Sequence, residues 1–400
     1  MCLSSSPRKR GIKKRNPIPI DLVMEEILAR LPAKSLMRFK CVSKLWSSHI
    51  MSRHFNNLFL TVPSRPRPRL YMTLGDHKAQ ESVILSLAPD TTTLSTFVVD
   101  HGLTIPEQGG YILQNLNGFM CHTYGKQPRI FNPATRQLVT LTPPVEVEEE
   151  EEEDWTRDFS VRYYCGHDPI NDQYKVICST SVFFKFWGVL RSELWVFVLN
   201  CRGSSWKKVP DFFPHHLPSL QGLCIDGVIY YLALIATHDY IIVTFHIASE
   251  EFKSIQVPHK EGELLPRTLT NRNHNLIDYG GKLTIVDQTK LGDEGMLDLW
   301  VLEDATNKEW SRKTLVLQPS QLHLVNSLSF KVKCTTQNGK LFLIPPEGFL
   351  PPFHVLCYDM QSNDMSKIEI KGVPNWSSED KVDFDFMFMD QSESLIHLET

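Results

Sequence analysis

The second part of the chain repeats one pattern, and this repeat constrains the fold more than any other feature. A strand-like run ends at a small or acidic turn, a few polar residues follow, and an aromatic or apolar run then leads to a proline. The clear copies read IFNPATRQLVTLTPP, VFVLNCRGSSWKKVP, TFHIASEEFKSIQVP, WVLEDATNKEWSRKTLVLQP and CYDMQSNDMSKIEIKGVP. Their turns lie at Asn132, Asn200, Ala248, Asp304 and Asp359, which are 68, 48, 56 and 55 residues apart, and a weaker copy turns at Asp90.

A second motif lies between these copies. In LNGFMCH, IDGVIYYL, YGGKLTIV and QNGKLFLI a turn leads directly into a strand, and each turn contains a glycine, at Gly118, Gly227, Gly281 or Gly339. Glycine suits such a hairpin turn because the turn needs a positive φ. Two hairpins per repeat make a four-stranded blade, and repeats of about 50 residues with this content indicate a β-propeller. Six blades fit best, five or seven stay open, and an irregular β-sandwich is the alternative.

Residues 16–60 follow a different pattern, which predicts three short helices. Val23, Ile27 and Leu31 recur at helical spacing before Pro32 ends the first helix. A second helix is predicted over residues 33–40 and a third over residues 42–50. So small a unit cannot enclose all of its apolar residues, and some of them are therefore expected to face a partner.

Charge is concentrated in two runs outside these patterns. The chain of 400 residues has a formal net charge of -4 and 42% hydrophobic residues, which predicts a folded protein. Residues 8–15 (RKRGIKKR) lie in a tail, residues 1–15, that is expected to be disordered and is either a nuclear import signal or a solvated basic segment. The acidic residues 146–154 are expected to form an inserted loop, at 145–155. The remaining charge does not favour a nucleic-acid-binding core.

Signatures of catalysis and metal binding are not found in the sequence. The nine cysteines contain no CxxC pair, and no G-x-S-x-G, H-E-x-x-H, Walker or G-x-G-x-x-G motif is present. His215 and His216 form the densest histidine pair, but in a proline-flanked loop they are expected to be surface polar residues rather than metal ligands. Asp168 and Asp172 are expected to form turns rather than an acid pair. No catalytic residue, cofactor or metal is therefore predicted.

The apolar residues of the repeats are expected to pack rather than to bind a ligand. The tryptophans expected to lie between blades are Trp195, Trp206, Trp300, Trp310 and Trp376. No secretory signal is seen, and the longest apolar run, about residues 227–236, is half the length of a membrane span. A soluble protein of the nucleus, the cytoplasm or both is expected, with no membrane partner.

The N-terminal helical segment resembles a known module. IPIDLVMEEILARLPAKSLMRFKCVSKLWSSHI closely resembles the F-box of plant F-box proteins over some 30 residues. The resemblance implies binding of a Skp-family adaptor and, through it, of the cullin and RING subunits of an SCF-type ubiquitin ligase. It assigns adaptor contact to Ile18, Pro19, Leu22, Ile27, Leu28, Leu31, Pro32, Leu36, Phe39, Val42 and Trp46. Some of these residues must instead form the module's own core, and the sequence does not divide the two sets.

The remainder also resembles a known region. NPATRQ, GHDPINDQYKV, IDGVIYYLA and LWVLEDATNKEWSRK resemble the F-box-associated (type 3) β-propeller of plant F-box proteins, over residues 65–400. We therefore expect a mainly β protein with a small α module: a three-helix F-box at 16–60 and a probable six-bladed β-propeller. The resemblance implies a non-catalytic substrate receptor that recruits an unknown protein substrate. The alternatives are a propeller that binds proteins outside any ligase and a propeller enzyme, which would need a metal or paired acids.

Overall fold

The computed structural model divides the chain into two compact units, residues 1–65 and residues 66–400, which are described separately. The basic tail and the acidic run lie outside the described residues, and no described helix is long and apolar enough to cross a membrane. The structure describes residues 18–61, 69–76, 81–90, 95–100, 105–106, 111–124, 126–145, 157–184, 188–199, 203–210, 214–235, 240–258, 274–326, 330–336, 339–345, 352–374, 383–389 and 394–398.

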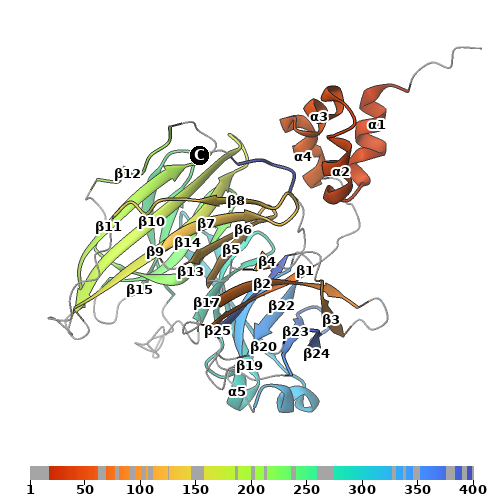
Figure 1. Cartoon of the computed structure of the whole chain (residues 1–400). Helices are drawn as coiled ribbons and strands as arrows, with labels where there is room; N and C mark the ends of the chain where they lie inside the picture. Colours follow the sequence, from red (N-terminus) through yellow and green to blue (C-terminus); the bar gives the residue numbers. More distant parts are fainter. Residues whose placement is uncertain are drawn as a thin grey trace, which may run out of the picture. The chain divides into compact units, whose positions relative to one another are not determined.

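The first unit consists of short helices, drawn in red in Figure 1. They are α1 (Ile20–Glu26), the 3-10 helix η1 (Leu28–Arg30), α2 (Ala33–Phe39), α3 (Lys44–Ile50) and α4 (Arg53–Thr61). The first predicted helix therefore ends earlier than expected and continues as a tighter turn. The three-helix prediction also omitted α4, which Ser52 caps by accepting a hydrogen bond from the Phe55 N–H (3.2 Å).

Prolines and serines fix where these helices begin. Pro19 and Pro32 stand at the N-cap positions of α1 and α2, where a missing N–H costs nothing. Ser43 caps α3, because its Oγ accepts a hydrogen bond from the Trp46 N–H (3.2 Å). The core beneath these caps consists of Met24, Leu28, Ala29, Ala33, Leu36, Ile50, Phe55 and Phe59.

The second unit is built from antiparallel four-stranded sheets. Four described sheets follow the chain without crossovers, as the first motif and the glycine motif predict. They are β5 (Tyr111–Leu116), β6 (Phe119–Tyr124), β7 (Gln127–Asn132) and β8 (Gln137–Thr140); β9 (Arg157–Asp168), β10 (Gln173–Phe184), β11 (Gly188–Val198) and β12 (Lys207–Lys208); β13 (Leu217–Ile225), β14 (Val228–Leu234), β15 (Tyr240–His246) and β16 (Glu251–Gln256); and β17 (His274–Tyr279), β18 (Lys282–Asp287), β19 (Met296–Asp304) and β20 (Glu309–Val316).

A nine-stranded sheet contains the remaining described strands. In sheet order they are β21 (Lys331–Thr335), β22 (Lys340–Ile344), β23 (His354–Asp359), β24 (Asp364–Lys371), β3 (Thr96–Val99), β2 (Glu81–Pro89), β1 (Arg69–Asp76) and β25 (Asp383–Met389), with β4 (Ile105–Pro106) against β2. The pair β24–β3 is parallel, whereas the other pairs are antiparallel. The described connections include α5 (Leu291–Glu294) and the 3-10 helix η2 (Pro319–Leu324).

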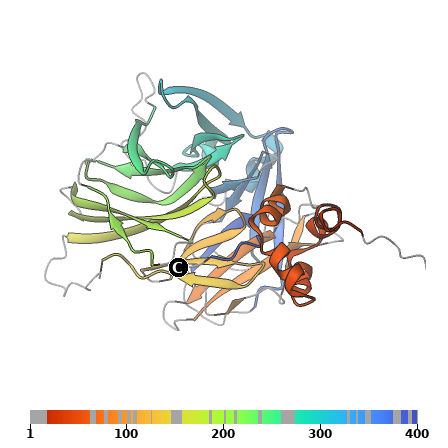
Figure 2. The same cartoon turned by 90° about the horizontal axis from the view of Figure 1, so that it is seen from above.

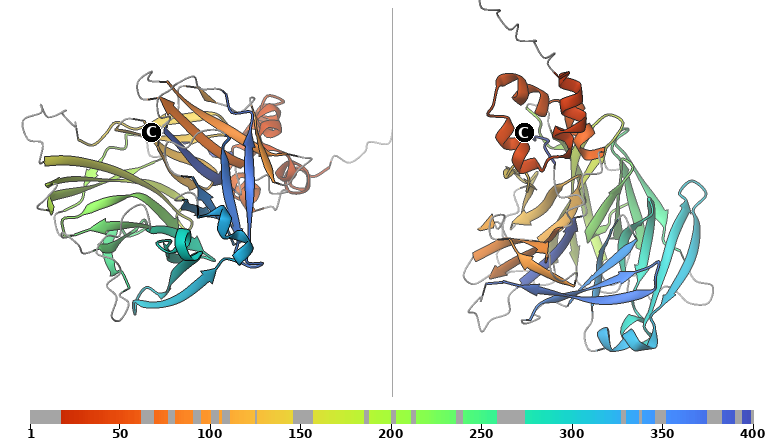
Figure 3. Two further views of the ribbon diagram at one scale, coloured as in Figure 1. Left: turned by 90° about the horizontal axis from the view of Figure 1, so that it is seen from below. Right: turned by 90° about the vertical axis from the view of Figure 1, so that its right-hand side faces the viewer.

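The sheets of this unit follow one another around a common centre in chain order (Figures 2 and 3). The strands β5, β9, β13, β17, β21 and β25 each contact the next, and β25 contacts β5. At Gly166 in β9 the packing is so close that a Cβ atom would lie 2.5 Å from Ile229 Cγ1 of β14. The unit is therefore mainly β and propeller-like, while the number of six blades stays a prediction because two predicted blades form one continuous sheet.

The last strand closes the unit on the first. In β25, Phe388 lies opposite Leu70 of β1, so the two ends of the unit share one sheet. The chain then reaches the next sheet, where Asn132 Nδ2 donates hydrogen bonds to the carbonyl oxygens of Ser394 (2.9 Å) and Ile396 (3.1 Å). The C-terminal residues are therefore part of the packed structure.

The repeated turns have a common geometry. The side chains of Asn132, Asp304 and Asp359 each accept hydrogen bonds from the backbone N–H groups two and three residues later. The third copy is shifted from its predicted position. In the first copy the Arg136 N–H donates a hydrogen bond to the Asn132 carbonyl, and in the third copy the Glu250 N–H donates one to the His246 carbonyl. His246, rather than Ala248, is therefore the equivalent residue, and the turn at residue 200 lies outside the described residues.

The four glycines of the second motif occupy the turns predicted for them. Gly118, Gly227, Gly281 and Gly339 have φ values of 84°, 78°, 82° and 75° and connect the first and second strands of their sheets. The described tryptophans pack between neighbouring sheets as expected: Trp206, for example, donates a hydrogen bond to the Thr142 carbonyl (2.6 Å), which follows β8 of the preceding sheet. Residue 376 lies outside the described residues.

Candidate functional site

The structure separates the predicted adaptor-contact residues into three groups. Ile18, Leu22, Ile27 and Val42 are half or more exposed, at 63%, 52%, 50% and 62%, and Pro19 is exposed as well. The side chains of Leu28 and Leu36 are buried, at 2% and 0%. Intermediate exposure is found for Leu31, Pro32, Phe39 and Trp46.

Burial decides which of these side chains are free to contact a partner. Leu28 and Leu36 fill the core of the helical unit, so they support the surface from below. Trp46 packs against Phe39 with ring centroids 5.5 Å apart, and both residues keep intermediate exposure. Pro32 is the N-cap of α2, and its carbonyl accepts hydrogen bonds from the N–H groups of residues 35 and 36.

The exposed large apolar side chains of the helical unit form the set that we call the apolar surface. It consists of Ile18, Leu22, Ile27, Val42, Leu45 and Met51. Leu22 lies in α1, and Ile18 precedes the helix by two residues, just before its N-cap Pro19. Leu45 and Met51, exposed by 60% and 50%, also belong to this set, although the resemblance did not assign them adaptor contact.

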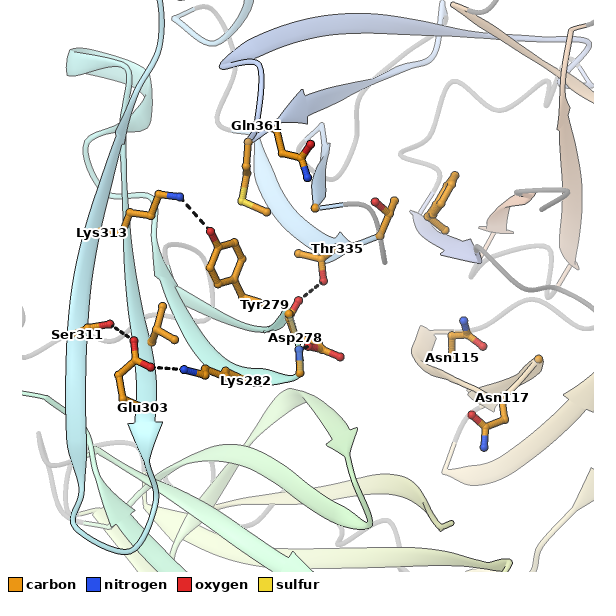
Figure 4. Close-up of a pocket in the computed structure, with 18 residues that line it drawn as sticks. Asn115, Asn117, Asp278, Tyr279, Lys282, Glu303, Ser311, Lys313, Thr335 and Gln361 are labelled. Atoms are coloured by element: carbon orange, nitrogen blue, oxygen red, sulfur yellow. Dashed lines mark hydrogen bonds and ion pairs between the residues drawn. The ribbon is translucent and has the colours of Figure 1, made fainter. Parts of the chain in front are cut away.

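The propeller-like unit contains a polar cavity of about 1220 Å³ (Figure 4). Segments from three sheets line it: the β5–β6 turn with Asn117, the end of β17 with Asp278, and the β21–β22 turn with Gly339. These positions are far apart in the sequence, and the circular order of the sheets brings them together. The glycine motif marked the turns but did not predict a cavity.

Two of the four charged side chains that line the cavity form an ion pair. Lys282 forms an ion pair with Glu303, and Ser311 Oγ donates a hydrogen bond to the same carboxylate (2.5 Å). The Lys282 ammonium, followed by the Ser311 hydroxyl, holds the pKa of Glu303 below its usual range. Lys313 donates a hydrogen bond to the Tyr279 hydroxyl (2.9 Å) and lies over that ring. These groups form one wall of the cavity.

Asp278, which also lines the cavity, forms no ion pair with a described residue. Its Oδ1 accepts a hydrogen bond from the Gly281 N–H (2.7 Å), and its backbone carbonyl accepts one from Thr335 Oγ1 (2.7 Å). Burial, together with the nearby charge of Asp226, raises the pKa of the Asp278 carboxyl, while the Gly281 hydrogen bond opposes this shift. The opposite wall presents the amides of Asn115 and Asn117.

A neighbouring turn is connected to the cavity through Asn117. Asn117 Nδ2 lies 2.9 Å from His167 Nδ1, and His167 Nε2 lies 2.9 Å from a carboxylate oxygen of Asp172. Asp168 accepts hydrogen bonds from the Ile170 N–H (2.9 Å) and from Asn171 (2.6 Å), which confirms the predicted turn chemistry. The sequence had not indicated the part that His167 takes in fixing Asn117.

The histidine pair does not lie wholly at the surface, which corrects the prediction. His215 is exposed, but His216 is completely buried, with its Nε2 3.0 Å from the Tyr231 hydroxyl. Burial lowers the pKa of His216 to about 4. Among the residues that the structure describes, no group of three or more His, Cys, Asp or Glu side chains is placed to hold a metal ion.

Both units match known protein families. Residues 18–58 match the family described as F-box domain, and residues 69–392 match the F-box associated beta propeller domain. F-box/LRR-repeat protein At2g40920 of Arabidopsis thaliana is 45% identical over 388 residues, covering 95% of this chain and 87% of the relative. F-box protein At2g40925 of Arabidopsis thaliana is 43% identical over 403 residues, covering 98% and 97%. The chain therefore belongs to the F-box proteins that have an F-box associated β-propeller domain.

Family membership gives the helical unit and the whole chain a general role. An F-box domain implies binding of a Skp1-type adaptor, and this implies the role of a substrate receptor in an SCF complex. Proteins of this family are in general adaptors without catalytic activity.

Proposed function

We propose that this chain is the substrate-recognition subunit of an SCF-type ubiquitin ligase. In this proposal the helical unit docks the Skp-family adaptor, which links it to the cullin and RING subunits, and the propeller-like unit recruits a protein substrate. The observation that supports it is the apolar surface: six large apolar side chains lie exposed within residues 18–61 of an F-box domain.

Apolar burial supplies the driving force for adaptor binding. Each square ångström of apolar surface removed from water contributes about 25 cal/mol, and a few central side chains usually supply most of the affinity of an interface. Leu22 lies on α1 and Leu45 on α3, and Pro19 and Ser43 fix where these two helices begin. The partner therefore meets a largely preformed surface, which lowers the entropic cost of binding.

The chain itself performs no chemical step in this proposal. It holds the substrate beside a ubiquitin-charged enzyme, which raises the effective concentration of substrate lysines at an active site on another protein. We also propose that this takes place in the nucleus, the cytoplasm or both, with the basic run at residues 8–15 as the import signal. A fluorescent fusion in which these basic residues are replaced by glutamine should lose nuclear signal.

The adaptor contact is tested with substitutions at exposed positions. The double variant Leu22→Asp, Val42→Asp places charge on the apolar surface without entering the core and should weaken adaptor binding by about 100-fold or more. The matched control is Val316→Asp, because Val316 is 52% exposed but lies on β20 of the other unit. Binding is measured by titrating purified adaptor and by co-elution.

Each result has a definite meaning. Loss of adaptor and cullin with the double variant, but not with the control, supports the proposal. Unchanged adaptor binding by a folded double variant would contradict the assignment of the apolar surface. Recovery of adaptor without cullin from cell extract would favour the alternative, a propeller protein that acts outside a ligase.

A further inference from the structure

The polar cavity of the propeller-like unit has an uneven distribution of charge. Lys282 and Glu303 neutralise each other, and Lys313 is directed to Tyr279. Among the described residues, no cation lies within ion-pair distance of Asp278. Asp278 extends from the end of β17 toward the side on which Asn115 and Asn117 lie (Figure 4).

A second carboxylate strengthens the negative potential at this end of the unit. Asp226 stands in the β13–β14 turn, is exposed, and lies near enough for its charge to raise the pKa of Asp278. Asp278 is exposed at the end of β17, so its carboxylate is accessible to a ligand in the cavity. A cation placed there would relieve the repulsion between the two carboxylates.

The remaining lining fits a long cationic side chain and the peptide that bears it. The amides of Asn115 and Asn117 offer both donors and acceptors to a peptide backbone, and His167 holds Asn117 in place. Val301 and Met360 offer apolar contact, which suits the methylene stem of lysine or arginine. A volume of about 1220 Å³ exceeds that of one side chain and is sufficient for a short segment of chain.

We propose that this cavity binds a segment of the substrate protein that presents a lysine or arginine side chain, with Asp278 as its counter-ion. This inference rests on the proposed function, whose substrate class it specifies. A phosphorylated segment is the alternative occupant, with Lys313 as its cation because Lys282 is already paired with Glu303, and the test below therefore includes phosphoserine.

The test uses the full chain co-purified with a Skp-family adaptor. The complex is screened against a random-peptide display library, with a parallel library that has a fixed phosphoserine. Selected sequences are then synthesised, and their affinities for the wild type and for two variants are measured by fluorescence anisotropy. Asp278→Asn removes the charge but keeps the oxygen that accepts the Gly281 hydrogen bond, so the turn should be retained. Thermal unfolding checks that it is.

The matched control is Asp293→Asn, which removes the same charge from an exposed aspartate in α5, after the second strand of the same sheet. We expect the selected peptides to be enriched in lysine and arginine. Their affinity should fall by about tenfold or more for Asp278→Asn and should change by less than about twofold for Asp293→Asn. The affinity for the wild type should also fall with added salt.

Several results would overturn the inference. These are a selection without enrichment of basic residues or without any binder, equal binding of basic peptides by Asp278→Asn, and preference for the phosphoserine library. If basic peptides bind only after residues 1–15 are removed, the cavity belongs to the chain's own basic run and not to a substrate. Adaptor co-purification reports on the proposed function separately, so a chain that binds adaptor but no basic peptide refutes only the inference.

Discussion

The helical unit exposes six large apolar side chains within residues 18–61, whereas five are exposed among all the described residues of the much longer propeller-like unit. The six form the apolar surface. The five are Val98, Leu138, Phe159, Ile170 and Val316, which lie on separate strands and turns of different sheets. Unit size accounts for part of the difference, because a small unit buries a smaller fraction of its surface. Among the described residues, exposed large apolar side chains are therefore concentrated in the helical unit, as the proposed adaptor contact requires.

The two units also offer different kinds of contact. The helical unit presents aliphatic side chains, which favour strong binding to one apolar partner surface but give little discrimination between ligands. The cavity of the other unit presents amides, hydroxyls and carboxylates, which favour binding of ligands that supply matching hydrogen-bond or ionic partners. This division suits a receptor with a constant partner at one unit and a specific ligand at the other.

The largest expected effect comes from removing residues 383–400. This deletes β25, whose Phe384, Phe386 and Met389 are buried, and also removes the hydrogen bonds of the C-terminal residues to Asn132. Buried side chains of this size contribute about 1.5–3 kcal/mol each, so the loss is comparable to a whole domain's stability of about 5–15 kcal/mol. The cooperative thermal transition of the propeller-like unit should disappear.

The same truncation tests whether the helical unit stays folded without an intact propeller-like unit. Limited proteolysis should leave a protected helical fragment that still binds adaptor, and removal of residues 1–17 serves as the control that preserves both transitions. Loss of adaptor binding in the truncated chain, with the fragment intact, would show that the comparison of two self-contained units is incorrect.

The next effect separates core from surface within the helical unit. Leu36→Ala should cost about 2–5 kcal/mol, because Leu36 is fully buried and truncation leaves a cavity. Leu45→Ala, at a position exposed by 60%, should change stability by less than about 0.5 kcal/mol but weaken adaptor binding. Chemical unfolding and adaptor titration of both variants measure the two effects. Equal stability losses would remove the distinction between core and apolar surface.

The third effect is a loss of stability of the propeller-like unit in mild acid. Burial, and then the charge of Arg129, lowers the pKa of His122 from 6.5 to about 4, and burial lowers that of His216 to about 4. Between pH 6.5 and about pH 4 these histidines are protonated in the unfolded chain but neutral in the folded protein. The stability is therefore present above pH 6.5 and is lost as the pH falls toward 4.

At about pH 5 each of these histidines should cost about 2 kcal/mol relative to neutral pH. Urea unfolding at the two pH values measures the difference. Glutamine cannot take up a proton. In His122→Gln the difference in unfolding free energy between the two pH values should therefore be smaller by the contribution of one histidine, whatever the stability of the variant at neutral pH. An unchanged pH dependence in this variant would show that His122 is not the responsible group.

Local signals predicted the architecture well. The hairpin glycines, such as Gly118 and Gly227, were found because a positive φ is a property of a few adjacent residues. The copy around Ala248 was shifted by two residues, because no side-chain cap at His246 marks its turn in the sequence. The fourth helix was missed although Ser52 and the spacing of Phe55 from Phe59 could have indicated it.

The sites were harder to predict, since they depend on packing between distant segments. The resemblance to the F-box placed Leu28 and Leu22 in one group, and only the folded unit shows that the first is buried and the second exposed. The cavity joins Asn117 and Asp278, which are brought together by the closing of the sheets rather than by any local motif. Such groupings cannot be derived from one segment of sequence at a time.

The pairing of β25 with β1 also has a consequence for how the protein is made. A ribosome releases the first strand long before the last, so β1 must wait for its partner while the intervening strands are synthesised. At about 5–20 residues per second this delay is on the order of tens of seconds. The helical unit precedes β1 and needs none of the later chain for its own core. It is therefore able to fold, and in the proposed function to bind its adaptor, while the propeller-like unit is still an incomplete chain on the ribosome.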